Sequence, residues 1–254
     1  SDKEIIKKNN IKKIKFNKKN YNKIYNEKII QNIVKKKKLK FEGVSINSKE
    51  IKKDNLFIAI KGKNHDGHNF VKAVIKNKSN YCVVQKKINS LHGQKLIKCS
   101  STFNFLNKLA TQKRKNTKSR IIAITGSSGK TTLKTLLGKT LSECGKTYFS
   151  PKSHNNHIGV PLSLCNLEHD HKYGVFEIGM SNKGEIRNLS SLVKPNIAII
   201  TNIGEAHMEN FANLNGIAKA KSEIIENINK DGYLILNRDD KYFNYLSKLA
   251  KKKK

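Results

Sequence analysis

Apolar runs alternate with segments of helical spacing through the second half of the chain. Four runs have the pattern of buried strands, at 121–125, 175–178, 197–201 and 233–236. Segments with the pattern of helices lie at 130–144, 184–193, 215–228 and 239–250. This strand–helix alternation predicts an α/β fold in which helices cover both faces of a mostly parallel sheet.

The first half of the chain carries a smaller unit of the same class. Three short strands and one helix are predicted there, the strands at 44–46, 56–60 and 81–84 and the helix at 70–77. Residues 1–40 are strongly basic and are predicted to form an arm or ragged helices, and the polar residues 112–119 a linker. The chain therefore divides into this arm, a small α/β domain at 41–112 and a larger one at 119–254.

The formal net charge of +33 has two explanations. A nucleic-acid-binding or membrane-binding surface would use such a positive field. However, four of the 52 basic residues are arginine, and a surface selected to bind phosphate would use more of these bidentate side chains. Codon bias toward Lys, Asn and Ile explains the charge better, so we expect no nucleic-acid partner.

The cysteines and the hydropathy pattern favour a cytoplasmic protein. Cys82, Cys99, Cys144 and Cys165 form no CxxC pair, which fits free thiols better than a disulfide frame or a zinc site. No apolar run is long enough to span a membrane, and no signal-peptide core lies near the start. We expect a cytoplasmic monomer without a membrane span.

The strongest local signal is a glycine-rich turn between a predicted strand and a predicted helix. Its residues are Gly126, Ser127, Ser128, Gly129, Lys130, Thr131 and Thr132. Backbone N–H groups in such a turn can bind phosphate oxygens, and the helix N-terminus adds partial positive charge. Lys130 can reach the β- and γ-phosphates of ATP, and the Thr131 hydroxyl can ligate Mg²⁺. Two residues separate the glycines where the general P-loop has four, so a tight turn with an incidental lysine is the alternative.

This short loop resembles the ATP loop of the Mur ligases and of the folylpolyglutamate synthases. Segments farther along are similar to Mur ligases in the expected order, at 155–162, 176–180, 184–186, 201–207 and 217–224. Segments 44–49, 56–62 and 66–70 resemble the nucleotide-sugar domain of the family, which folylpolyglutamate synthases lack. The resemblance covers residues 41–250 and implies a UDP-substrate domain followed by a P-loop-type ATPase domain.

The resemblance also implies a metal site at the carboxyl ends of the strands. Glu177 and His207 match metal-site residues of the family, and Asn202 is expected to bind ATP. Lys221 matches a lysine that CO₂ carbamylates, which turns an ammonium into an anionic oxygen ligand suited to Mg²⁺. ATP, Mg²⁺ and CO₂ are thus the implied cofactors, with Lys130, His207 and Lys221 catalytic. A merely solvated Glu177 and a surface His207 are the alternatives.

Five residues are expected to bind the substrate by the same resemblance. Ser48 lies in a motif that is usually Asp-Ser-Arg, and its flanking residues are Asn and Lys here. Asp66 and His68 follow in the order expected for the UDP-substrate domain. Asn155 and Asn156 belong to the segment that resembles the D-alanyl-D-alanine-adding ligase, although asparagines also commonly cap turns.

The implied activity is ATP-dependent amide bond formation in peptidoglycan precursor synthesis. The family member that the chain resembles most joins D-alanyl-D-alanine to a UDP-MurNAc-tripeptide through an acyl phosphate. One alternative is the ligase that adds the third amino acid to UDP-MurNAc-dipeptide, and another is a nucleic-acid-binding P-loop NTPase. Because the rest of the family's ATPase domain and its third domain do not follow residue 254, we expect a truncated chain, inactive as a ligase alone.

Overall fold

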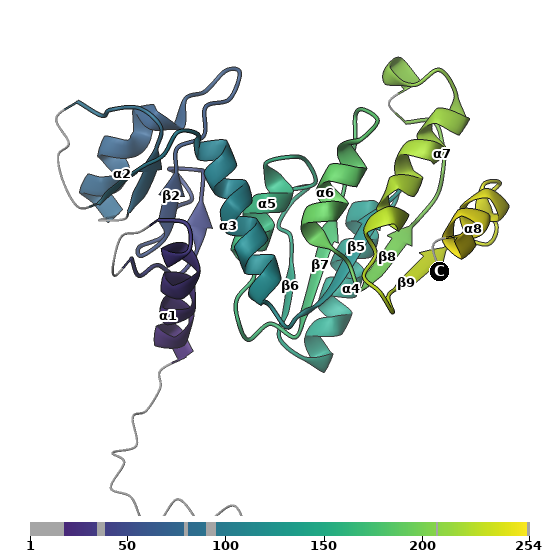
Figure 1. Cartoon of the computed structure of the whole chain (residues 1–254), viewed down its shortest axis with the longest axis horizontal. Helices are drawn as coiled ribbons and strands as arrows, with labels where there is room; N and C mark the ends of the chain where they lie inside the picture. The colour runs from purple at the N-terminus through teal and green to yellow at the C-terminus, as the bar shows by residue number, and fades with distance from the viewer. Residues whose placement is uncertain (1–17, 35–38, 79–80, 90–94, 207, 253–254) are drawn as a thin grey trace, which may run out of the picture.

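Two α/β parts lie side by side in the computed structural model, with helix α3 (Thr102–Asn116) between them (Figure 1). The structure describes residues 18–34, 39–78, 81–89, 95–206 and 208–252. Within these ranges, no helix combines the length and the hydrophobicity needed to cross a membrane.

The N-terminal part is built on a parallel sheet whose described strands have the order β1-β2-β3-β4. These strands are β1 (Val44–Ser45), β2 (Leu56–Ile58), β3 (Cys82–Val84) and β4 (Leu96–Lys98). Alternate β2 residues point to opposite faces, so that Phe57 packs with α2 (Val71–Lys78) and Leu56 with α1 (Lys18–Gln31). The turn η2 (Gly67–Phe70) leads into α2. Helix α1 lies within the segment 1–40 that was predicted as a basic arm or ragged helices, and residues 1–17 lie outside the described chain.

The larger part confirms the predicted parallel sheet. Its described strands have the order β6-β7-β5-β8-β9, and every pair is parallel. They are β5 (Arg120–Thr125), β6 (Thr147–Phe149), β7 (Tyr173–Glu177), β8 (Ile197–Ile200) and β9 (Tyr233–Leu236). The central strand β5 lies between β7 and β8, so the carboxyl ends of these three strands meet at one edge. Ligands of open α/β sheets bind at such an edge.

Helices cover both faces of this sheet. Helix α4 (Lys130–Cys144) packs Leu133, Leu137 and Leu141 against the face of β5 that carries Ile122 and Ile124. The opposite face packs in another cluster with α5 (Gly159–Cys165) and α6 (Glu185–Val193). The remaining helical elements are η3 (Met208–Asn210), α7 (Leu214–Ser222), η4 (Glu223–Asn227) and α8 (Phe243–Lys252). Each face of β5 is therefore buried, which explains its continuous apolar run.

The predicted linker at 112–119 is wrong, because helix α3 extends into this segment. The helix continues to Asn116, and β5 begins at Arg120, so only a short segment between them is extended. Lys113 is 1% exposed and donates to the Asn26 Oδ1 atom at 2.7 Å, while Arg114 donates to the backbone oxygens of Val193 and Lys194. The polar residues thus belong to a packed helix because their long side chains reach acceptors inside the protein. One apolar cluster runs through α3 and joins the two parts.

Candidate active site

Two glycines shape the turn between β5 and α4. Gly126 has a φ of 147°, and a Cβ atom there would lie 1.8 Å from the Thr201 Oγ1 atom just after β8. Gly129 has a φ of 77° and occupies the N-cap of α4. A residue with a side chain would be strained at both positions, so glycine allows the loop to pass close to β8 and then begin a helix at once. This confirms the predicted strand–turn–helix arrangement.

Residues that follow β8 hold this loop in place. The Ser127 hydroxyl donates to the Gly204 carbonyl oxygen and accepts from the Gly204 N–H, each at 2.8 Å. The Asn202 Oδ1 atom accepts from the Ser128 N–H at 2.9 Å, and Nδ2 donates to the Ser128 hydroxyl at 2.8 Å. The structure therefore brings Ser127, Ser128 and Asn202 together, and their mutual bonds fix the shape of the loop.

Lys130, the first residue of α4, folds its side chain back over the loop. Its Nζ atom donates to the carbonyl oxygens of Gly126 at 2.7 Å and Ser127 at 3.1 Å. Burial lowers the pKa of Lys130, and the negative charge of Glu177 opposes that shift. The next residues, Thr131 and Thr132, are exposed in the first turn of α4. An ammonium beside the free N–H groups of a helix N-terminus concentrates positive potential where an anion can bind.

Glu177 ends β7 as a buried carboxylate, 1% exposed. Its Oε2 atom accepts from the Thr131 hydroxyl at 2.8 Å, and its Oε1 atom accepts from the Asn155 Nδ2 atom at 2.8 Å. The Lys134 Nζ atom lies 3.7 Å from Oε2. Glu177 is thus not the solvated surface carboxylate of the alternative interpretation. A hydroxyl and a carboxylate in contact form an oxygen donor set that suits a hard cation.

Lys221 lies in α7 and is 2% exposed. Burial, together with the positive charge of Lys130, lowers the pKa of Lys221 to about 7. This shift favours the uncharged amine, which is the form that can react with CO₂. His207, the other predicted metal-site residue in this region, lies outside the described residues.

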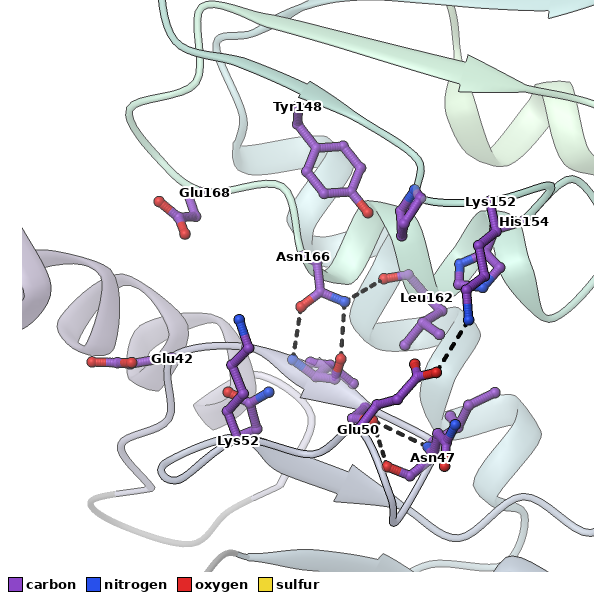
Figure 2. Close-up of a pocket in the computed structure, with 16 residues that line it drawn as sticks. Glu42, Asn47, Glu50, Lys52, Tyr148, Lys152, His154, Leu162, Asn166 and Glu168 are labelled. Atoms are coloured by element: carbon purple, nitrogen blue, oxygen red, sulfur yellow. Dashed lines mark hydrogen bonds and ion pairs between the residues drawn. The ribbon is translucent and has the colours of Figure 1, made fainter. Parts of the chain in front are cut away.

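A cleft of about 560 Å³ lies between the two parts of the chain (Figure 2). One wall comes from the segment after β1, including Asn47 and Glu50, and the other from residues after β6, including Lys152 and His154. The Lys152 Nζ atom reaches across the cleft to the Glu50 Oε1 atom at 3.1 Å. The cleft therefore lies beside two segments that carry predicted substrate residues, Ser48 after β1 and Asn155 after β6.

Beside this cleft, Asn166 attaches the N-terminal part of the chain to the larger part. The Asn166 side chain accepts from the N–H of Val44 and donates to its carbonyl oxygen, each at 2.9 Å. Both backbone groups of one β1 residue are therefore satisfied by a single side chain from the other part. Such a bond pair positions the cleft walls relative to each other.

Comparison with known proteins places this geometry in a family. The model of the Mur ligase middle domain matches residues 124–254, which is more than half of the chain, and the model of the Mur ligase family catalytic domain matches residues 40–114. The chain belongs to the Mur ligase family.

Two relatives and two solved structures illustrate the similarity of individual proteins to this chain. The UDP-N-acetylmuramoyl-tripeptide–D-alanyl-D-alanine ligase of Rickettsia prowazekii is 39% identical over 82% of this chain and 46% of its own length, and that of Escherichia coli is 33% identical over 84% and 47%. The structure of MurF from Acinetobacter baumannii is 32% identical, with a TM-score of 0.77 over 89% of this chain and 51% of that one. MurF of Thermotoga maritima in complex with ADP is 30% identical, with a TM-score of 0.71 over 83% and 48%. The chain spans about half the length of these relatives.

In this Mur ligase chain the predicted substrate residues fall into separate places. Ser48 lies between the cleft residues Asn47 and Glu50. His68 is buried, its Nε2 atom accepts from the Gln85 N–H at 3.1 Å, and its Nδ1 atom lies 2.6 Å from the Asp66 Oδ1 atom. These bonds indicate the tautomer with the proton on Nδ1. Asp66 and His68 thus bond within the protein and hold the turn η2.

Asp66 and the two asparagines also have specific partners. The Asp66 carboxylate caps η2 and accepts from Lys86 at 2.7 Å, and this contact lowers the pKa of Asp66. Asn155 reaches Glu177, whereas the Asn156 Oδ1 atom accepts the backbone N–H groups of Ile158 and Gly159 at the start of α5. Turn capping, the alternative interpretation, therefore describes Asn156 and not Asn155.

Sequence reasoning missed Lys134. This residue is buried beside Glu177, 2% exposed, although a lysine on a helix is usually solvated. Its position one turn after Lys130 and Thr131, among the leucines that face the sheet, is a signal that could have indicated burial. Its charge faces the same carboxylate that Thr131 contacts.

Proposed function

We propose that this chain comprises the UDP-substrate domain and part of the ATPase domain of a ligase that joins D-alanyl-D-alanine to UDP-MurNAc-tripeptide. The observation that carries the proposal is the contact between the phosphate loop and a buried carboxylate, Thr131 to Glu177 at 2.8 Å, with Asn155 on the other carboxylate oxygen. The relatives that bear this enzyme name support the choice of substrate.

The nucleotide would bind at the N-terminus of α4. The loop N–H groups and Lys130 would contact the phosphates of ATP, and Lys130 would exchange its bonds to the loop carbonyls for phosphate oxygens. Asn202 would keep the loop in its binding shape through Ser128. The Thermotoga maritima MurF structure is a complex with ADP, which supports nucleotide binding by a related chain.

Mg²⁺ would be held by oxygen ligands beside the phosphates. Thr131 and Glu177 already lie in contact, and we propose that carbamylated Lys221 and His207 complete the set. The depressed pKa of Lys221, about 7, supports carbamate formation because CO₂ reacts with the neutral amine. Bound Mg²⁺ would neutralise phosphate charge during phosphoryl transfer.

The uridine sugar would occupy the cleft between the two parts. Ser48 and its neighbours after β1 would contact the nucleotide-sugar end, and Asn155 would orient the substrate beside Glu177. Asp66 and His68 would act indirectly, because their polar atoms already bond to protein groups. The peptide carboxylate would then lie near the γ-phosphate.

The chemistry asks the protein mainly to position anionic reactants. The γ-phosphoryl group would pass from ATP to an oxygen of the peptide carboxylate, which releases ADP. The amine of D-alanyl-D-alanine would then attack the carbonyl carbon of this acyl phosphate. The tetrahedral intermediate then collapses to the amide as phosphate leaves and the amine loses a proton. The two substrates supply both attacking groups, so no protein nucleophile is needed. Lys130 would stabilise the charge on the transferred group.

Calorimetric titration of the 254-residue chain tests the substrate assignment. We expect Mg-AMP-PNP to bind, and UDP-MurNAc-tripeptide to bind more tightly than UDP-MurNAc-dipeptide. A preference for the dipeptide would instead support the ligase that adds the third amino acid. Absence of nucleotide binding together with salt-sensitive, sub-micromolar DNA affinity would contradict the proposal and favour a nucleic-acid-binding NTPase.

Phosphate release from Mg-ATP tests the reaction itself. The assay would use a ligase that carries these domains, with UDP-MurNAc-tripeptide and D-alanyl-D-alanine in one mixture. A second mixture would contain UDP-MurNAc-dipeptide with diaminopimelate or lysine. Release in the first mixture alone is the expected result.

A further inference from the structure

Helix α4 buries a charged residue because it lies unusually close to β6. A Cβ atom at Gly138 would be 2.4 Å from the Phe149 ring, so the absence of a side chain lets the helix approach the strand. Lys134, one turn earlier on α4, is consequently carried into the interior and is 2% exposed. Its side chain reaches both β7 and the segment that follows β6.

The Lys134 ammonium lies between two acceptors from different elements. Its Nζ atom is 3.7 Å from the Glu177 Oε2 atom and donates a hydrogen bond to the Lys152 carbonyl oxygen. Burying an ammonium is unfavourable unless it is paired, so these acceptors are what keep it inside. Lys134 thus connects the carboxylate of the nucleotide site to the backbone of a neighbouring loop.

The loop at 150–156 has a second attachment to the same carboxylate. The Asn155 Nδ2 atom donates to Glu177 Oε1 at 2.8 Å, and the Asn155 carbonyl oxygen accepts from the Gly179 N–H at 2.8 Å. The two oxygens of Glu177 therefore hold this loop at two points, one directly and one through Lys134.

The loop at 150–156 also forms a wall of the cleft between the two parts. Lys152 has a positive φ of 52°, a conformation that a lysine rarely adopts without restraint, and Lys134 bonds to its carbonyl oxygen. The Lys152 side chain crosses the cleft to Glu50 at 3.1 Å (Figure 2). A continuous series of contacts thus runs from Glu177 through Lys134 and Lys152 to the N-terminal wall.

We propose that Lys134 is a positioning residue that couples occupancy of the nucleotide site to the shape of the substrate cleft. This inference rests on the proposed function, because it takes Mg-nucleotide as the ligand beside Glu177. A cation drawn to Glu177 competes with Lys134 for the carboxylate charge. The Lys152 carbonyl oxygen then remains as the acceptor of the ammonium, and this bond holds the cleft wall in its substrate-binding position. Bound nucleotide therefore strengthens binding of the uridine sugar.

Calorimetry on the full 254-residue chain measures this coupling. The Kd of UDP-MurNAc-tripeptide is determined alone and with saturating Mg-AMP-PNP. For the unaltered chain we expect the nucleotide to lower this Kd by about fivefold or more, within the usual range of coupling between sites. The coupling is expressed as the ratio of the Kd without nucleotide to the Kd with nucleotide. In Lys134→Met this ratio falls to about one, because no ammonium links the two sites. Lys134→Arg, which keeps the charge, restores part of it.

Two further variants separate positioning from folding. Lys139→Met removes an exposed lysine from the same helix and should leave the ratio unchanged. If Lys134→Met does not fold, Lys134→Gln replaces it, and it should also lose the coupling because it lacks the charge. Hydrogen–deuterium exchange without nucleotide gives an independent readout. Exchange at 150–156 should increase in the Lys134 variants and not in Lys139→Met.

The outcomes distinguish this inference from the proposed function. An unchanged ratio in folded Lys134→Met or Lys134→Gln, or a ratio of one in the unaltered chain, overturns the coupling while leaving the binding assignments intact. Failure of the unaltered chain to bind either probe overturns the proposed function and this inference with it. A ratio near one in Lys134→Met or Lys134→Gln, together with an unchanged ratio in Lys139→Met, supports the coupling.

Discussion

Replacing Lys113 by methionine should change how the stability of the chain depends on pH. Lys113 is 1% exposed in α3, where its ammonium donates to Asn26 and lies 4.8 Å from the centre of the Tyr25 ring. These contacts are with neutral groups, and burial lowers the pKa of Lys113 from 10.5 to about 8. The charged form is therefore less favourable in the folded state than in the unfolded chain.

The sign and the size of the effect follow from linkage. Between pH 8 and 10.5 the unfolded chain keeps a proton on Lys113 that the folded protein has lost, so the free energy of unfolding rises with pH. The difference between the two pKa values corresponds to about 3 kcal/mol. Below pH 8 this destabilisation is present in full, and above pH 10.5 it is absent.

Urea unfolding between pH 7 and 10.5 measures the effect. The free energy of unfolding of the unaltered chain minus that of Lys113→Met should increase by about 3 kcal/mol across this range. Lys108→Met, which removes an exposed lysine from the same helix, is the matched control and should show no comparable change. Taking differences cancels the titration of the other lysines. Parallel pH curves for the unaltered chain and Lys113→Met would refute the reasoning.

Three further predictions concern the candidate active site. Lys130→Ala should lower the rate of ligation by more than about 100-fold, because a main stabiliser of phosphate charge is lost, and near-normal turnover would contradict the phosphate-loop assignment. Lys221→Ala should abolish turnover that acetate or formate partly restores in place of the carbamate, and full activity without such rescue would rule out the metal role. Gly126→Ala should weaken Mg-AMP-PNP binding by about tenfold or more, since its Cβ atom would lie 1.8 Å from Thr201 Oγ1. Gly62→Ala, whose Cβ atom would make an ordinary 3.5 Å contact, should bind nucleotide normally in the same titration.

The parts of the site that the sequence predicted are those whose signals are local. The phosphate loop combines a buried strand, glycines with positive φ and a helix start within a dozen residues, so its geometry follows from short-range constraints. Glu177 was placed at a strand end for the same reason, since parallel strands bring their carboxyl ends to one edge. The contacts of Glu177 with Thr131 and Asn155 depend on the order of strands in the sheet, which hydrophobic periodicity does not contain.

Buried lysines account for much of what sequence reasoning did not predict. Hydrophobic periodicity treats lysine as polar, so Lys113 fell within a predicted linker and nothing marked Lys134 as buried. Each is buried because an acceptor distant in the sequence meets its ammonium, Asn26 in one case and Glu177 with the Lys152 carbonyl oxygen in the other. In a chain with so many lysines, composition conceals the few that carry a specific role. Those few are identified by the acceptors that the fold brings to them, and such acceptors become visible only when the two sheets and α3 are assembled.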